Sequence, residues 1–160
     1  MVPIKQKLRH MRTKWLLKIK EEVIKQLKIR FIKPMHQAKW IVNVVPVPKK
    51  DGKVKMCMDF KDLNKAFPKD DFPLPHIDVL VDSTADSTLM SFMDGFSRYN
   101  QIKMTSKDMT KATFTTEWGI HCYTIMPFRL KNTGVTYQRM ATAYYMTWCI
   151  IRLKYMLMTW

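Results

Sequence analysis

The stretch that decides the fold reads VPVPKKDGKVKMCMDFKDLNKAFPKDDFPLPHID and covers residues 45–78. It contains the end of one apolar, β-like run, 41–47, and all of a second, 53–60. The dipeptide Asp51-Gly52 lies between them, and Asp-Gly between two such runs is a strong hairpin signal. The three prolines that follow predict an irregular segment.

Outward from this hairpin, the pattern alternates between helix and strand. Helical spacing of apolar residues predicts an amphipathic helix over 15–29, which we expect to pack on a sheet; membrane binding is the less favoured alternative. Further expected elements are a short helix at 77–81, a buried strand at 89–93, a second hairpin at 112–126 and a helix at 133–145. This mixture predicts an α+β fold with an antiparallel sheet and packed helices.

Charge is the main compositional feature. The chain has 28 Lys and Arg against 13 Asp and Glu, a formal charge of +15 over 160 residues. A surplus of this size on an apolar-rich, folding sequence favours a polyanionic partner such as nucleic acid. A generic solvated basic surface is the alternative, because charge informs solubility rather than fold.

Cysteine and histidine usage indicates neither a disulfide framework nor a zinc site. The three cysteines are an odd number and lie far apart, and no Cys/His pair has zinc-ligand spacing. A reducing compartment is therefore the default. The N-terminus is charged and predicts no signal peptide. Residues 144–160 are apolar but are interrupted by Arg152 and Lys154, so we expect no spanning helix and no membrane partner.

Several motifs, taken together, resemble the reverse transcriptases of gypsy-type LTR retrotransposons, especially those of plants. They are the stretch 45–78, SFMDGFSRYNQIKM (91–104), MPFRLKNTGVTYQRM (126–140) and the helix WLLKIKEEVIKQL (15–27). The resemblance implies the fingers and partial palm of a right-hand polymerase. It also implies an RNA/DNA primer–template and a dNTP as partners, and an intracellular location in a cytoplasmic particle or the nucleus. The oligomeric state stays open.

On this resemblance the chain divides into a basic N-terminal arm (1–14), fingers and partial palm (15–140) and an aberrant C-terminal segment (141–160). The family's reaction uses two Mg²⁺ ions held by carboxylates. The resemblance assigns the first metal-binding aspartate to Asp94. It assigns to Gly95 a backbone carbonyl that reaches the second ion.

The resemblance also assigns binding roles away from the metals. Lys49 and Lys55 match the cations that hold the incoming triphosphate, and Lys at the second site lacks the planar fork of the usual Arg. The nucleotide pocket takes Tyr99 under the sugar, Phe128 and Arg129 beside the nucleotide, and Gln138 on the helix behind it. For Phe128 and Gln138, ordinary core packing is the alternative. Residues expected near nucleic acid are Asp59, Lys61, Lys50 and Lys53.

The match fails at the second carboxylate motif. The family carries Tyr-x-Asp-Asp some 20 residues after the pair Tyr137-Gln138, but no Asp or Glu follows Glu117 in this chain. One aspartate cannot hold two divalent ions, so we expect no polymerase activity and doubtful Mg²⁺ binding. Permitted codons for residues 155–160, read from the third base, spell Tyr-Val-Asp-Asp-Met. We therefore hypothesise a frameshift between about Arg139 and Met146, which sequencing the locus would test.

Glycine is scarce at four residues, and Arg30, Arg98 and Arg129 stand where the family usually has Gly. Each change can arise from one G-to-A transition, so mutational decay and ordinary lineage drift are both open. We expect the two pocket arginines to strain the backbone or obstruct binding. Three functions remain in view: an inactive reverse transcriptase fragment, a residual sequence-independent nucleic-acid binder, and an active domain whose missing aspartates come from another chain.

Overall fold

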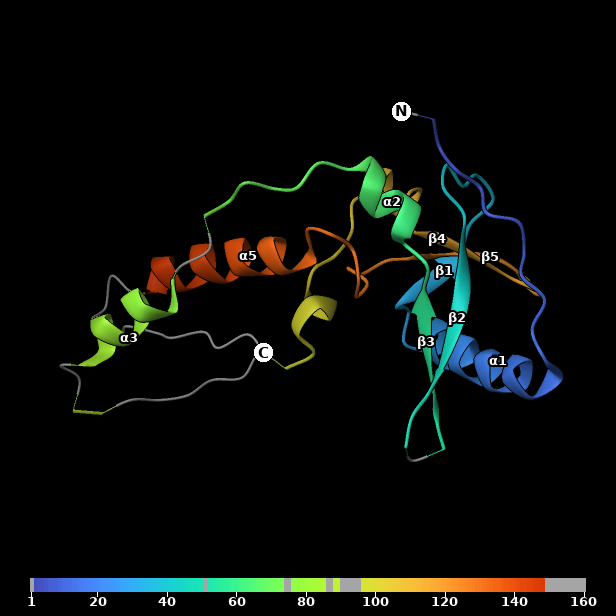
Figure 1. Cartoon of the computed structure of the whole chain (residues 1–160), viewed down its shortest axis with the longest axis horizontal. Coiled ribbons are helices and arrows are strands. Elements are labelled where there is room, and N and C mark those ends of the chain that lie inside the picture. The colour runs from blue at the N-terminus through green and yellow to red at the C-terminus, as the bar shows by residue number, and fades with distance from the viewer. Residues whose placement is uncertain (1, 51, 74–75, 86–87, 90–95, 149–160) are drawn as a thin grey trace.

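The computed structural model describes residues 2–50, 52–73, 76–85, 88–89 and 96–148 (Figure 1). Five strands form one sheet in the order β1-β5-β4-β2-β3. Their bounds are Ile32–Pro34 (β1), Val42–Pro48 (β2), Val54–Met58 (β3), Thr113–Thr116 (β4) and Gly119–Tyr123 (β5). The predicted α+β fold and both predicted hairpins, β2–β3 and β4–β5, are confirmed.

One pairing departs from the antiparallel sheet that the pattern predicted. The neighbours β2 and β4 run parallel, with Val42 opposite Phe114 and Asn43 opposite Thr115. Parallel neighbours need a long crossover, and the segment between β3 and β4 supplies one. The sheet is therefore mixed, with the parallel pair joining two antiparallel parts.

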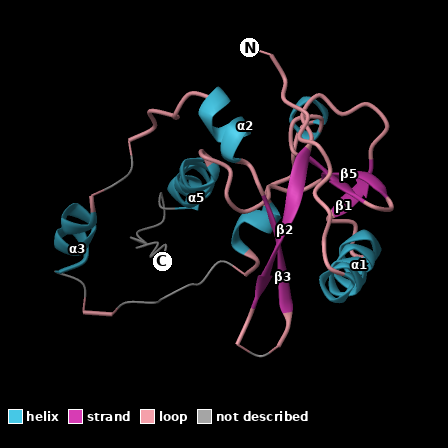
Figure 2. Ribbon diagram, turned by 45° about the vertical axis from the view of Figure 1, so that its right-hand side comes forward, coloured by secondary structure: helices cyan, strands magenta, loops and turns pink. Residues whose placement is uncertain are grey.

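The helices differ in how close they lie to this sheet. Figures 1 and 2 show α1 beside the strands, while α3 and α5 extend away from them. The helices predicted at 15–29, 77–81 and 133–145 are confirmed; the predicted strand 89–93 lies, apart from Leu89, outside the described residues. The bounds are Thr13–Lys28 (α1), Lys61–Ala66 (α2), Ile77–Ala85 (α3), Ser106–Met109 (α4), Thr133–Trp148 (α5) and Arg98–Gln101 for the 3-10 helix η1.

The core lies between α1 and the sheet. Ile19 and Val23 of α1 are buried, and they belong to one apolar cluster with Phe60 and Phe114. Leu17, on the other face of α1, is exposed. Full burial of an aliphatic side chain contributes about 1.5–3 kcal/mol. The amphipathic helix is thus packed on the sheet, as its spacing predicted.

The N-terminal arm is held against β2 by hydrogen bonds. The backbone amide of Gln6 donates to the Ile41 carbonyl at 2.8 Å, and the backbone amide of Ile41 donates to the Ile4 carbonyl at 3.2 Å. The side chain of Asn43 is buried; it donates to the Lys7 carbonyl at 2.8 Å and accepts from the Arg9 amide at 3.1 Å. A buried amide needs such partners, so the arm satisfies a polar group of the sheet.

Three arginines occupy backbone conformations that favour glycine. The φ angles are 59° at Arg30, 41° at Arg98 and 77° at Arg129. A left-handed conformation costs a residue with a Cβ roughly 1–2 kcal/mol. The backbone strain expected at the two pocket arginines is confirmed, and Arg30 shows the same conformation.

Arg30 takes this conformation because it follows the last turn of α1. The Arg30 amide donates to the Leu27 carbonyl at 3.0 Å, and the Phe31 amide donates to the Gln26 carbonyl at 2.9 Å. This pair of bonds is the Schellman arrangement, whose left-handed position is usually glycine. The helix ending therefore imposes the positive φ whichever side chain is present.

Candidate nucleotide pocket and nucleic-acid interface

The β2–β3 hairpin presents exposed lysines at its tip. The Lys49 amide donates to the Lys53 carbonyl at 2.8 Å, and the Gly52 amide donates to the Lys49 carbonyl at 3.1 Å. The turn requires φ of 74° at Gly52, which glycine adopts freely. Lys50 at the tip and Lys55 on β3 are exposed as well. The described part of the tip therefore carries several cations next to hydrogen-bonded backbone.

A contact from α1 fixes this tip further. The Lys18 ammonium donates to the Gly52 carbonyl at 2.6 Å. Charge-assisted hydrogen bonds of this kind are shorter and stronger than neutral ones. Sequence reasoning missed this role, because the spacing of α1 indicates only that Lys18 lies off its apolar face. This hydrogen bond links α1 to the tip of the hairpin.

An aromatic pocket of about 520 Å³ adjoins the hairpin. The Lys55 ammonium lies 4.8 Å from the centre of the Phe128 ring. The Tyr99 ring lies 6.3 Å from Phe128 and meets Tyr137 edge-on at 5.4 Å. Lysine over an aromatic face and edge-to-face rings are favourable geometries. The structure thus brings Lys55, Tyr99 and Phe128 together, as the resemblance implied.

Of two further residues expected at this pocket, one lines it and the other does not. Arg129 lines the pocket and is exposed. Gln138 is half-buried on α5, next to Tyr137, and does not line it. Asp94 and Gly95, the expected metal site, lie outside the described residues, while Phe96 and Ser97 immediately after them line the pocket.

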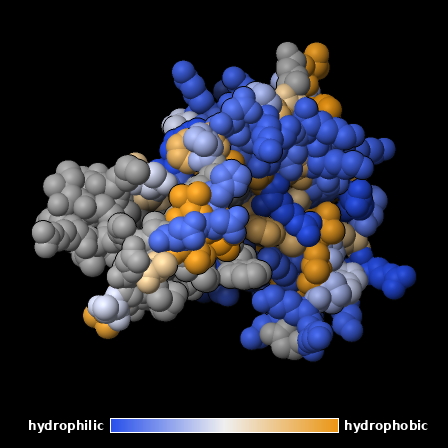
Figure 3. Space-filling model, turned by 60° about the vertical axis from the view of Figure 1, so that its left-hand side comes forward, coloured by the Kyte–Doolittle hydropathy of each residue, from blue (hydrophilic) through white to orange (hydrophobic). Residues whose placement is uncertain are grey.

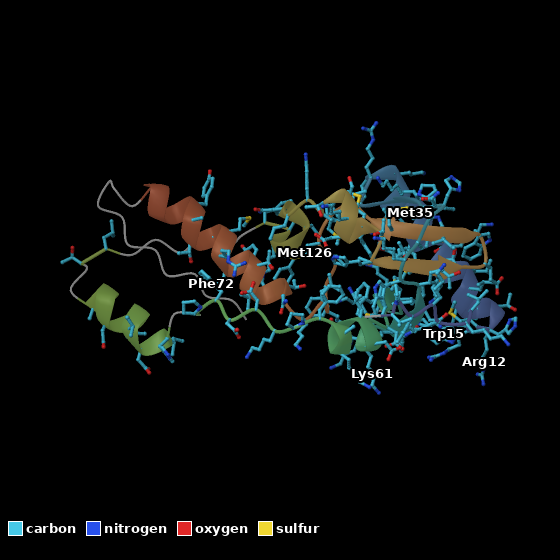
Figure 4. All side chains as sticks on the ribbon, turned by 90° about the horizontal axis from the view of Figure 1, so that it is seen from above. Arg12, Trp15, Met35, Lys61, Phe72 and Met126 are labelled. Atoms are coloured by element: carbon cyan, nitrogen blue, oxygen red, sulfur yellow. The ribbon has the colours of Figure 1, made fainter. Side chains whose placement is uncertain are left out.

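The residues expected near a template strand lie where β3 leads into α2. The Asp59 amide donates to the Asn43 carbonyl at 3.0 Å, and the Asp59 carboxylate accepts from the Lys61 amide at 3.4 Å. Lys61 opens α2 and is exposed; Figure 4 shows it at the outer side of this helix. Gln6 of the arm donates to the Asp59 carbonyl at 3.4 Å and to the Asp62 carboxylate at 3.0 Å. The N-terminal arm is therefore hydrogen-bonded to the segment that joins β3 to α2.

Asn64 ties α2 to the segment that carries Phe128 and Arg129. Its amide nitrogen donates to the Arg129 carbonyl at 2.8 Å, and its amide oxygen accepts from the Lys131 amide at 2.8 Å. Two opposed bonds hold the backbone in one register, which sustains the positive φ at Arg129. No periodicity or spacing signals this role; the only hint is that Asn64 belongs to the motif 45–78.

A second tie joins the segment after α2 to α5. Asn132 donates to the Pro68 carbonyl and accepts from the Asp70 amide, both at 3.1 Å. The Arg139 guanidinium donates to the Asp70 carboxylate at 2.6 Å, and this bond holds the pKa of Asp70 below its usual value. Arg139 also lies 4.9 Å from the Phe72 ring. Figure 4 shows Phe72 beside α5. These contacts orient the helix behind the pocket.

Polar residues dominate the face seen in Figure 3, where apolar residues gather in a smaller central area. None of the described helices is long and apolar enough to span a bilayer. Within the described residues no three His, Cys, Asp or Glu side chains gather as a metal site. In the sequence, no Asp or Glu follows Glu117.

The buried cysteines and His121 belong to the sheet. Cys57 and Cys122 are buried free thiols, and burial raises the pKa of Cys122. His121 stacks on Phe114 with ring centres 5.7 Å apart, and burial lowers its pKa. Burial also raises the pKa of Tyr123. A depressed histidine pKa and raised thiol and phenol pKa values keep all three groups neutral, as apolar packing requires.

Comparisons with known proteins agree with this architecture. The chain is 33% identical over 107 residues to a retrovirus-related Pol polyprotein from transposon opus of Drosophila melanogaster, which covers 67% of this chain and 11% of that protein. It is 33% identical over 84 residues to an RNA-directed DNA polymerase homolog of Oenothera berteroana, covering 52% of this chain and 59% of that protein. The chain thus spans about a tenth of the fly polyprotein.

Solved structures share the fold. The foamy viral protease-reverse transcriptase in complex with an RNA/DNA hybrid covers 92% of this chain and 20% of its own, with a TM-score of 0.70 and 18% identity. The foamy viral protease-reverse transcriptase dRH in complex with dsDNA covers 92% of this chain and 25% of its own, with a TM-score of 0.69 and 19% identity. Residues 47–148 match the family described as "Reverse transcriptase (RNA-dependent DNA polymerase)". The chain, most of which lies in that match, belongs to the reverse transcriptase family, and it is similar to that domain of retrotransposon Pol polyproteins.

Proposed function

We propose that this chain is the fingers and partial palm of a gypsy-type, plant-like LTR retrotransposon reverse transcriptase, and that it binds nucleic acid and nucleotide without polymerising DNA. The observation that carries the proposal is the fixed lysine hairpin beside an aromatic pocket. Lys49, Lys50 and Lys53 stand at the tip, and Lys55 lies over Phe128. The cations can bind the phosphate groups of a nucleotide or strand, and the aromatic rings beside them can stack on its bases.

Nucleic-acid binding is supported by charge and by position. The formal charge is +15, and the hairpin lysines and Lys61 are exposed. The similar foamy viral structures hold dsDNA and an RNA/DNA hybrid. A protein that neutralises phosphates releases counterions, so its affinity falls steeply as salt rises. We propose Asp59 and Lys61 as template-side contacts, and Lys49 and Lys55 as the triphosphate contacts.

The proposed lack of polymerase activity rests on carboxylates. Asp94 is the proposed first metal ligand, with Gly95 offering a carbonyl, but the region where the second motif belongs has no Asp or Glu. Two divalent ions close together need several anionic oxygens. The frameshift between about Arg139 and Met146 is the proposed cause. Tyr99, Phe128 and Gln138 are proposed to shape or support the remaining nucleotide pocket.

Primer extension tests the inactivity. The full chain would be incubated with an oligo(dT)-primed poly(rA) template, dTTP and Mg²⁺, with an active reverse transcriptase as positive control. We expect no product. Extension by the purified chain would overturn the inactivity, and extension only after mixing with a second polypeptide would support aspartates supplied from another chain.

A salt titration tests the binding. Fluorescence anisotropy of a labelled primer–template duplex should show log K falling linearly with log salt, with a slope of roughly −0.9 per phosphate neutralised. Replacing Lys49 and Lys50 by Met should reduce that slope by about 2, while replacing Lys69 and Lys107, which lie away from the hairpin, should change it less. A flat response to salt would refute the electrostatic interface.

A further inference from the structure

The aromatic pocket carries three cations. Lys55, Arg98 and Arg129 line it, and its described lining residues include no Asp or Glu. The apolar part of the lining includes the rings of Tyr99 and Phe128. Such a pocket favours an anionic ligand with a flat, uncharged part.

Both arginines line the cavity without filling it. Arg129 is exposed and Arg98 half-exposed, and the pocket that they line with the rings has a volume of about 520 Å³. Their backbones are held at positive φ, and Asn64 fixes the Arg129 carbonyl at 2.8 Å. The side chain of Arg129 is therefore attached to a hydrogen-bonded backbone segment that lines the pocket. This geometry argues against simple obstruction, which the sequence alone had suggested.

We propose that Lys55, Arg98 and Arg129 bind the phosphate groups of a nucleotide without any divalent metal ion. The inference rests on the proposed nucleotide pocket, and it adds that guanidinium groups supply the positive charge there. Arginine presents a planar fork that matches two phosphate oxygens at once, and it stays charged at every relevant pH. The ligand's base or sugar then stacks against Tyr99 and Phe128.

The phosphates have two sources, a free nucleoside triphosphate or a nucleic-acid strand, and binding assays separate them. The probe is mant-dATP at constant ionic strength, in EDTA and in Mg²⁺. Competitors are inorganic tripolyphosphate and a 5′-phosphorylated oligonucleotide. We expect binding in EDTA that tripolyphosphate displaces. Displacement by the oligonucleotide at equal phosphate concentration would identify strand phosphates as ligands of the same pocket.

Glycine variants give the decisive comparison. R98G and R129G each remove one positive charge and suit the positive φ, so they should fold; each should weaken mant-dATP binding in EDTA about tenfold, the value of one strong charged hydrogen bond. R30G is the matched control, because it makes the same substitution at another positive-φ residue that does not line the pocket. It should leave the affinity unchanged.

Each other outcome overturns the proposal. Tighter binding by R98G or R129G would show that the arginines obstruct the pocket. Binding only in Mg²⁺ would show that a metal is needed, and equal loss in R30G would show unspecific attraction. The primer–template anisotropy assay is run in parallel. Metal-free mant-dATP binding without duplex binding would refute the proposed nucleic-acid interface alone, and duplex binding without metal-free mant-dATP binding would refute this inference alone.

Discussion

Replacing Arg30 by glycine should stabilise the protein by about 1 kcal/mol. Arg30 has φ of 59° at the Schellman ending of α1, and it is exposed, so its side chain buries little apolar surface. Relief of the left-handed conformation contributes roughly 1–2 kcal/mol. The greater freedom of glycine in the unfolded chain offsets about 0.4–1 kcal/mol of this gain.

The free energy of unfolding would be measured by urea titration followed by circular dichroism. For a chain of this length, a gain of about 1 kcal/mol corresponds to a rise in Tm of roughly 2–4 °C. R30A is the matched control: it also removes the arginine side chain but keeps a Cβ at the strained position, so it should give no comparable gain. A decrease in stability in R30G, or equal gains in R30G and R30A, would refute the argument from backbone strain.

Three further substitutions test the hydrogen bonds of Asn64 and Lys18 and the burial of His121. Asn64→Ala should lower the free energy of unfolding by about 1–2 kcal/mol, because it removes two hydrogen bonds of 2.8 Å; Asn64→Asp, which keeps the acceptor for the Lys131 amide, should lose less in the same urea titration. Lys18→Met should speed amide exchange at Gly52 and leave global stability within about 0.5 kcal/mol, whereas Lys28→Met, on the same helix, should change neither. Burial lowers the pKa of His121 below 6.5, so the folded state binds fewer protons than the unfolded one; stability present above pH 6.5 should be lost as the pH falls below it, and His121→Phe should flatten that part of the pH profile. An unchanged profile in His121→Phe would assign the pH dependence to other groups.

The sequence predicted the elements whose signals are local. Asp-Gly between β-like runs located the β2–β3 hairpin, and apolar spacing located α1. The strand β1 was missed, because three residues ending in a proline form no alternation that could be read. The parallel pairing of β2 with β4 was missed as well, since it depends on how a long crossover returns to the sheet.

Of the residues around the candidate site, only those assigned by the resemblance were predicted, and the supporting residues were missed. The resemblance assigned Lys55 to the triphosphate and Tyr99 and Phe128 to the nucleotide, and the structure groups these three residues around one pocket, while their roles stay predictions. The supporting residues Asn64 and Lys18 act through backbone carbonyls of distant segments. A side chain that bonds to a carbonyl leaves no pattern in the sequence, because any residue supplies the carbonyl.

The three strained arginines link the fold to its stability. Hydrogen bonds hold the positive φ at the end of α1 for Arg30 and beside Asn64 for Arg129, so the backbone keeps these conformations although an arginine side chain opposes them. Arg30 does not line the pocket that Arg98 and Arg129 share, so its cost should add to theirs, and at roughly 1–2 kcal/mol per residue the full sum is about 3–6 kcal/mol. Domains of this size have only about 5–15 kcal/mol of stability. The strain therefore offsets a large share of this stability. R30G, R98G and R129G combined should recover about half of the strain energy, because the greater freedom of glycine in the unfolded chain offsets about 0.4–1 kcal/mol at each position.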